Sequence, residues 1–74
     1  MSDMKIEING RSYQVACEDG QEDRLRLLAA SLQKRLQDVV STVGQVGQER
    51  LLVMTGLLIA DELSDALGEI ASAR

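Results

Sequence analysis

The sequence predicts an α+β fold, in which an N-terminal β-hairpin and one helix form a head and a long C-terminal coiled-coil helix follows. Three observations predict it. Two alternating apolar runs flank Asn9-Gly10, an amphipathic segment ends near Val43, and an apolar repeat of seven residues begins at Leu52. We expect residues 1–47 to form a globular ββα head and residues 48–74 an oligomerisation helix, together one structural unit.

The first two elements are predicted to be the strands of a hairpin. Apolar and polar residues alternate on both sides of Asn9-Gly10, which favours a two-residue loop; the apolar positions are Met4, Ile6, Ile8, Tyr13, Val15 and Cys17. Such a loop pairs position 8 with 11, 6 with 13 and 4 with 15, so one face of the ribbon is apolar and must be covered. Cys17 is expected to lie on that face as a small buried hydrophobe, not as a reactive thiol.

The third element is predicted to be a helix with one apolar face. Asp19 is expected to cap its N-terminus, with Glu22 as the capping-box partner three residues later. Apolar residues then recur at spacings of three and four as far as Val43. Gly44 suits the left-handed position after a helix, so residues 44–47 are expected to form a turn.

The last element is predicted to be a helix from Gln48 to the C-terminus. Its seven-residue repeat marks an oligomer interface, with the seam at Leu52, Gly56, Ile59, Leu63, Ala66 and Ile70. Gly56 in the seam would allow close approach of a partner helix, and Gly68 is expected to be tolerated within the helix. A helix of this length spans roughly 35 to 40 Å, more than the head could cover, so its far half needs another chain.

The composition excludes several classes of function. The 74 residues include no histidine and one cysteine, which rules out an internal disulfide and removes the usual zinc ligands and the bases that activate nucleophiles. We therefore expect no enzymatic activity, no metal, no cofactor and no small-molecule substrate. A net charge of -4 argues against nucleic acid, and the longest apolar stretch is too short for a bilayer. A cytoplasmic protein that associates with itself is expected.

Four segments, taken with their order and spacing, resemble the ZapA family of bacterial cytoplasmic proteins associated with the division ring. They are Ile8-Asn9-Gly10-Arg11-Ser12, Lys34-Arg35-Leu36-Gln37-Asp38, Glu49-Arg50-Leu51-Leu52-Val53 and Ala60-Asp61-Glu62-Leu63. The resemblance covers nearly the whole chain.

This resemblance implies a non-enzymatic adaptor at the mid-cell division site that binds filaments of FtsZ, the tubulin-like GTPase of the ring, and crosslinks them. In the family the long helices form an antiparallel coiled coil, dimers pair into tetramers, and heads project at both ends. Arg11 and Arg35 match basic positions that face the filament, and Glu49 matches an acidic residue at the start of the long helix. These three residues are the partner-binding positions that the resemblance implies.

The chain departs from the family pattern in two places. The turn at 44–47 has no basic residue, and the long helix stops at Arg74, shorter than is usual for the family. We therefore expect dimerisation through the seam and leave tetramer formation open. Two alternatives also remain open: a generic coiled-coil oligomerisation module with no filament partner, and a ribbon-helix-helix dimer that binds DNA.

Overall fold

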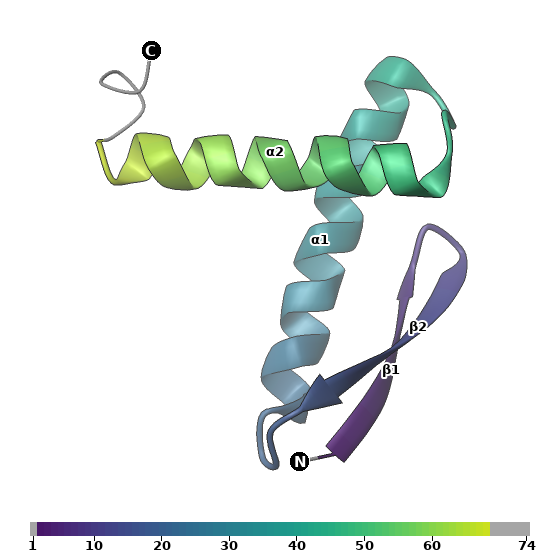
Figure 1. Ribbon diagram of the computed structural model, residues 1–74, viewed down its shortest axis with the longest axis vertical. Coiled ribbons are helices and arrows are strands. Elements are labelled where there is room, and N and C mark those ends of the chain that lie inside the picture. Colours follow the sequence, from purple (N-terminus) through teal and green to yellow (C-terminus); the bar gives the residue numbers. More distant parts are fainter. Residues whose placement is uncertain (1, 69–74) are drawn as a thin grey trace.

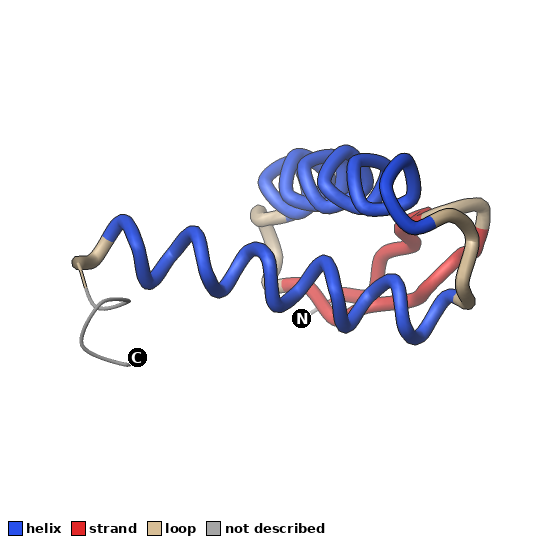
Figure 2. The backbone as a smooth tube through the Cα atoms, turned by 90° about the horizontal axis from the view of Figure 1, so that it is seen from above, coloured by secondary structure: helices blue, strands red, loops and turns tan. Residues whose placement is uncertain are grey.

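The computed structural model describes residues 2–68, which form a hairpin followed by two helices. The elements are β1 (Ser2–Ile8), β2 (Arg11–Cys17), α1 (Glu22–Val43) and α2 (Gln48–Ala66). Helix α1 forms one layer, and the hairpin and α2 lie in a second layer on one side of it (Figure 2). Helix α2 crosses α1 steeply above the tip of the hairpin, and its second half projects away from the head (Figure 1). The predicted α+β class is confirmed.

The predicted hairpin is confirmed in its register. Strands β1 and β2 pair antiparallel, with Ile8 opposite Arg11, Ile6 opposite Tyr13 and Met4 opposite Val15. Asn9 and Gly10 have φ angles of 53° and 79°, the positive values that a tight two-residue hairpin turn requires. Because β1 pairs along its length with β2 of the same chain, the strands do not have the single-strand arrangement of a ribbon-helix-helix protein.

The predicted cap at the start of α1 is wrong. The helix begins at Glu22, Gln21 is its N-cap residue, and no side chain caps it. The reason is the turn at residues 19–20, where Gly20 has a φ of 88° and separates Asp19 from the helix. The Glu22 carboxylate does reach back, but it accepts hydrogen bonds from the Gly20 amide at 2.8 Å and from the Ser2 hydroxyl at 3.2 Å.

The end of α1 is as predicted, and the end of α2 is not. After Val43, the Gly44 amide donates to the Val40 carbonyl at 2.7 Å, and Gly44 has a φ of 82°. Helix α2 was expected to reach the C-terminus, yet it ends at Ala66. Gly68 is not a tolerated helical residue, because it has a left-handed φ of 74° and its amide donates to the Asp65 carbonyl in a turn. Residues 69–74, with the predicted seam residue Ile70, lie outside the described residues.

The core joins three elements at the point where α2 crosses α1. Ile8 of β1, Leu36 of α1 and Leu51 of α2 are almost completely buried against one another. Thr55 is also fully buried, and its hydroxyl donates to the Leu51 carbonyl at 2.7 Å, so it brings no unpaired polar group into the core. The first half of α2 is therefore held on the head, whereas the second half lies beyond it.

Candidate functional site

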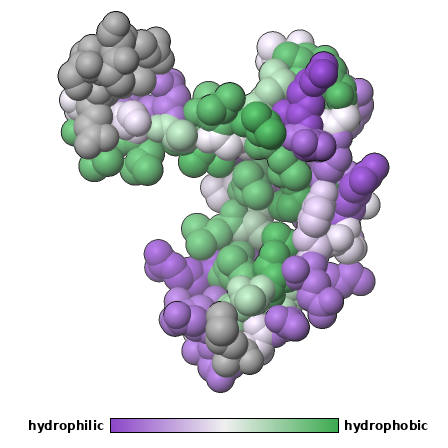
Figure 3. Space-filling model, in the orientation of Figure 1, coloured by the Kyte–Doolittle hydropathy of each residue, from purple (hydrophilic) through white to green (hydrophobic). Residues whose placement is uncertain are grey.

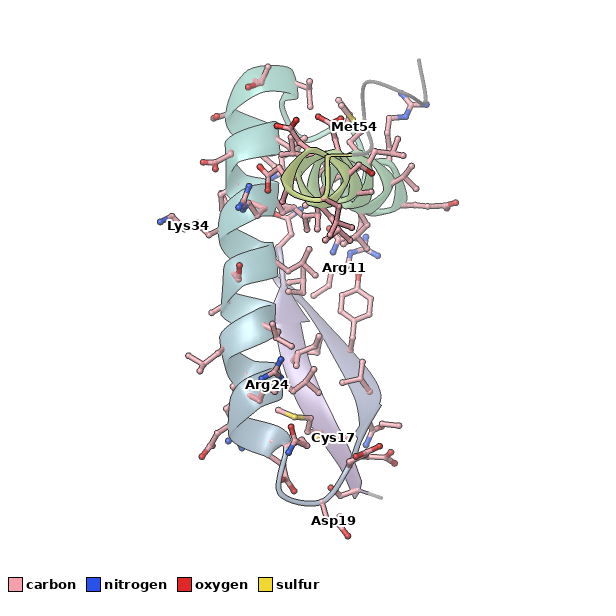
Figure 4. All side chains as sticks on the ribbon, turned by 90° about the vertical axis from the view of Figure 1, so that its left-hand side faces the viewer. Arg11, Cys17, Asp19, Arg24, Lys34 and Met54 are labelled. Atoms are coloured by element: carbon pink, nitrogen blue, oxygen red, sulfur yellow. The ribbon has the colours of Figure 1, made fainter. Side chains whose placement is uncertain are left out.

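Arg11 lies at the end of the hairpin that is nearest α2 (Figure 4). It is the first residue of β2, directly after the Asn9-Gly10 turn, and its side chain is exposed. Its place on the molecule is set by the hairpin register, which pairs it with the buried Ile8. A guanidinium in this position can make paired hydrogen bonds to a carboxylate on another protein.

Glu49 lies near the same corner of the molecule. It is the second residue of α2, it is exposed, and it follows Gln48, whose amide hydrogen-bonds the hairpin tip. Glu49 also lines a shallow hollow of about 580 Å³ at the start of α2, together with Val46, Gly47, Gln48, Arg50 and Val53. The structure thus brings two of the three predicted partner-binding residues, Arg11 and Glu49, to one edge.

Arg35 lies elsewhere. Its guanidinium forms an ion pair with Glu62 in the second half of α2, and the two side chains are 41% and 44% exposed. Thirteen residues separate Glu49 from Glu62, which is about 20 Å along a helix. Arg35 therefore does not belong to the edge that carries Arg11 and Glu49, and it is already engaged within the chain. Sequence reasoning did not identify Glu62 as its partner, because no local pattern predicts how two helices cross.

The predicted seam residues divide along α2. Leu52 is half-buried and packs against the core cluster, whereas Ile59 and Leu63 are 38% and 60% exposed, and Gly56 and Ala66 are exposed as well. An added Cβ at Gly56 would meet nothing within 4 Å in this chain. Of the seam residues that the structure describes, those on the projecting part of α2 are therefore the ones open to another molecule.

A second group of exposed apolar side chains lies beside that seam. Val53 is 56% exposed, Leu57 is 66% exposed and Leu67 is 62% exposed. Figure 3 shows apolar surface along the projecting half of α2 and on the adjoining side of α1. The seven-residue repeat marked one stripe of α2, but only the crossing with α1 reveals that the Leu51 and Thr55 side is covered and that the Leu57 side is open.

The whole arrangement is that of a small head with a charged edge and an apolar arm, and the chain matches a known family over nearly its full length. The family model described as "Cell division protein ZapA" matches residues 4–74. The chain belongs to the ZapA family.

Relatives that share the name Cell division protein ZapA agree with this assignment. The ZapA of Serratia proteamaculans is 36% identical over 59 residues, that of Erwinia tasmaniensis is 37% identical over 59, and that of Pectobacterium carotovorum is 34% identical over 64. These matches cover 80%, 80% and 86% of this chain but 54%, 54% and 59% of the relatives. The chain thus spans little more than half the length of these relatives. No solved structure matches it significantly.

In this ZapA-family chain Cys17 is buried, as predicted, and its environment disfavours the thiolate. Burial raises the pKa of the Cys17 thiol above its ordinary value of 9.0, and the carboxylates of Glu22, Asp19 and Glu18 raise it further. The thiol donates to the Glu18 carbonyl at 3.3 Å. Since the thiolate is the reactive form, these contacts favour a structural role for Cys17.

Two further findings concern metals and membranes. Among residues 2–68, no three side chains of the histidine, cysteine, aspartate and glutamate types are grouped so that they could hold a metal ion. Neither α1 nor α2 has both the length and the apolar character that a membrane crossing requires.

Proposed function

We propose that this ZapA-family chain is a non-enzymatic cell division adaptor that binds FtsZ filaments and crosslinks them at the mid-cell division site. Family membership supports the link to cell division. The observation that carries the proposal is the separation of two exposed surfaces on one small chain. The charged edge of Arg11 and Glu49 lies where the hairpin tip meets the start of α2, and the apolar face lies on the second half of α2 beyond it.

Self-association is proposed to occur through the projecting half of α2. Ile59, Leu63 and Ala66 follow one another at spacings of four and three, so they form one stripe on the helix. Val53 and Leu57 form a neighbouring stripe on the side opposite Leu51 and Thr55; it begins beside the hollow that Glu49 lines and continues onto the projecting half. Covering the first stripe requires one partner helix, and covering the second requires another. This favours dimers that pair into tetramers, with the head of residues 1–47 and the helix of residues 48–74 as the two functional parts.

Filament binding is proposed to occur through the edge of Arg11 and Glu49. The two exposed side chains carry opposite charges, and Arg50 adds a second cation at the adjoining hollow. Exposed charges of this kind give specificity and salt-sensitive binding more than raw affinity. An assembly with several heads compensates for weak single contacts, because the second contact is made at a high effective concentration. Bridging between filaments follows from that geometry.

The test is co-sedimentation with assembled FtsZ filaments, combined with light scattering to measure the mass of the free protein. We expect the wild-type chain to pellet with filaments and to have the mass of an oligomer. Arg11→Glu should weaken pelleting at least several-fold without changing the mass. Lys34→Glu is the matched control, because Lys34 is exposed on α1 and points away from the hairpin and α2 (Figure 4).

The outcomes separate the proposal from its main alternative. An oligomer that does not pellet with filaments would support a generic coiled-coil module. A monomer at micromolar concentration would contradict the self-association surface. Equal losses in the Arg11 and Lys34 variants would indicate a general charge effect, and the proposed edge would then be wrong.

A further inference from the structure

The tip of the hairpin is joined to the start of α2 by the side-chain amide of Gln48. Its Nε2 donates to the carbonyl oxygen of Ile8 at 3.0 Å and to the hydroxyl of Tyr13 at 2.8 Å. Its Oε1 accepts a hydrogen bond from Asn9 Nδ2 at 2.9 Å. Both N–H groups of the amide and its oxygen therefore bind the hairpin, on β1, on β2 and on the turn between them.

Two more glutamines hold Asn9 from other elements. The amide oxygen of Gln33 on α1 accepts from the Asn9 backbone N–H at 2.6 Å. Gln45, in the turn before α2, accepts from Asn9 Nδ2 at 3.0 Å and donates to Asn9 Oδ1 at 3.2 Å. Asn9 is thus held by three glutamine side chains, and Gln48 is the one that also bonds the two strands.

This network joins the two chain segments that carry the residues of the proposed binding edge. Arg11 follows Asn9 by two positions, and Glu49 is the residue after Gln48. Both are exposed, so their own side chains do not set the distance between the hairpin and α2. A two-stranded hairpin is marginally stable by itself, and its tip can move unless other elements hold it. The apolar core holds the hairpin at Ile8, and the amide of Gln48 holds its turn.

We propose that Gln48 is a positioning residue for partner binding, which keeps Arg11 and Glu49 in one arrangement that a protein surface with charges of both signs can recognise. This inference rests on the proposed function and names a residue of that same site. Gln48 does not need to touch the partner. It acts by restricting the conformations of the hairpin tip in the free protein. Less conformational entropy is then lost on binding, which is a general route to higher affinity.

The experiment is a double-mutant cycle on filament binding. Gln48→Met keeps the length of the side chain and removes all its hydrogen bonds, and Arg11→Ala removes the guanidinium. We expect each single variant to raise the concentration for half-maximal pelleting about three- to tenfold, and the double variant to remain within about twofold of Arg11→Ala alone. Such non-additivity indicates that Gln48 acts through Arg11 when circular dichroism shows the Gln48→Met variant to be folded, because an unfolded hairpin would also mask the effect of Arg11→Ala.

Two controls keep the result interpretable. Gln37→Met makes the same substitution at an exposed position of α1 and should leave binding unchanged. Tyr13→Phe removes only the hydroxyl that accepts from Gln48 Nε2, so it should weaken binding less than Gln48→Met does while folding as well as the wild type. Circular dichroism at the assay temperature shows whether each variant is folded, and light scattering shows whether its mass is unchanged.

The outcomes distinguish this inference from the function on which it rests. Losses that multiply in the double variant, or normal binding by both Gln48→Met and Tyr13→Phe while Arg11→Ala is weakened, would overturn the positioning role alone. If Arg11→Ala binds normally, the proposed edge is wrong and the positioning role with it. If the wild type does not pellet with filaments, the proposed function itself is wrong.

Discussion

Exchanging the charges of Arg35 and Glu62 separates two roles that Arg35 could have. The resemblance to the family implies that Arg35 faces the filament, whereas the structure pairs it with Glu62 across the crossing of α1 and α2. Arg35→Glu should therefore disturb both the crossing and any contact with a partner. The double variant Arg35→Glu with Glu62→Arg restores the ion pair in reverse, but it leaves an acidic residue where the partner would meet a base.

The expected effect on stability follows from the exposure of the pair. Both side chains are about two-fifths exposed, and ion pairs of that kind contribute about 0.2–1 kcal/mol. In Arg35→Glu that attraction is lost and a repulsion of similar size replaces it, so the free energy of unfolding should fall by about 0.5–1.5 kcal/mol. For a domain of this size, 1 kcal/mol corresponds to about 4–8 °C in Tm, which gives an expected loss of about 2–12 °C.

The assay is thermal unfolding by circular dichroism at one fixed protein concentration, followed by filament co-sedimentation of the same samples. We expect the double variant to regain most of the lost Tm and to pellet as the wild type does, because Arg35 lies away from the edge of Arg11 and Glu49. Weak pelleting with a restored Tm would instead place Arg35 in the contact with the partner. Recovery of both properties would mean that Arg35 acts only by holding α2 on α1. Failure to recover Tm would refute our reasoning that the ion pair stabilises the crossing. Reversal of Arg26, which pairs with Asp23 within α1, is the control and should change Tm less, because both side chains are more exposed.

Three further predictions concern the core, the arm and the response to acid. Leu51→Ala removes a fully buried side chain and should cost about 2–5 kcal/mol, seen as a large drop in Tm; a wild-type Tm would contradict its place in the core. Ile59→Asp should reduce the mass in light scattering, since an unpaired charge would be buried between helices, and an unchanged mass would locate the interface elsewhere. The pKa of Glu22 lies below its ordinary value of 4.5 because the backbone N–H groups of Glu22 and Gly20 hydrogen-bond the carboxylate. The folded protein thus binds this proton less readily than the unfolded chain, so the stability from Glu22 is complete above the unfolded-state pKa and is lost as pH falls through the folded-state pKa. Glu22→Gln should therefore lose less stability than the wild type between about pH 6 and about pH 3 in urea unfolding, and parallel losses would show that another carboxylate is responsible.

The hairpin was predictable because its determinants are adjacent in the sequence. Asn9 and Gly10 adopt the positive φ angles that their residue types permit, and the alternation of apolar residues then determines which residues pair. The end of α1 at Val43 was predictable for the same reason, since Gly44 takes a left-handed φ. The predicted cap by Asp19 failed because the Gly20 turn and the bond from Ser2 to Glu22 together place the start of the helix.

The candidate site was only partly predictable. The positions of Arg11 and Glu49 are separated by about half of the chain, and only the folded structure brings them to one edge through Gln48 and Asn9. Gln48 gave no signal in the sequence, since a single glutamine at the start of a helix is usually a solvated residue. The pairing of Arg35 with Glu62 could not be predicted from the sequence either, because Glu62 lies in the other helix.

By itself, the sequence determined the elements of this protein: a hairpin with a defined register, a first helix that ends at Val43, and a second helix rich in aliphatic residues. These follow from dihedral preferences and from apolar periodicity, which act over a few residues. The tertiary structure decided which sides of the second helix are covered and which remain open. Leu51 and Thr55 are buried at the crossing with α1, whereas Leu57 and Leu63 are exposed on the arm. The seven-residue repeat does not determine which side of α2 packs on the head. The contacts of Leu51 with Ile8 and Leu36, both of which lie far from it in the sequence, determine which side is buried.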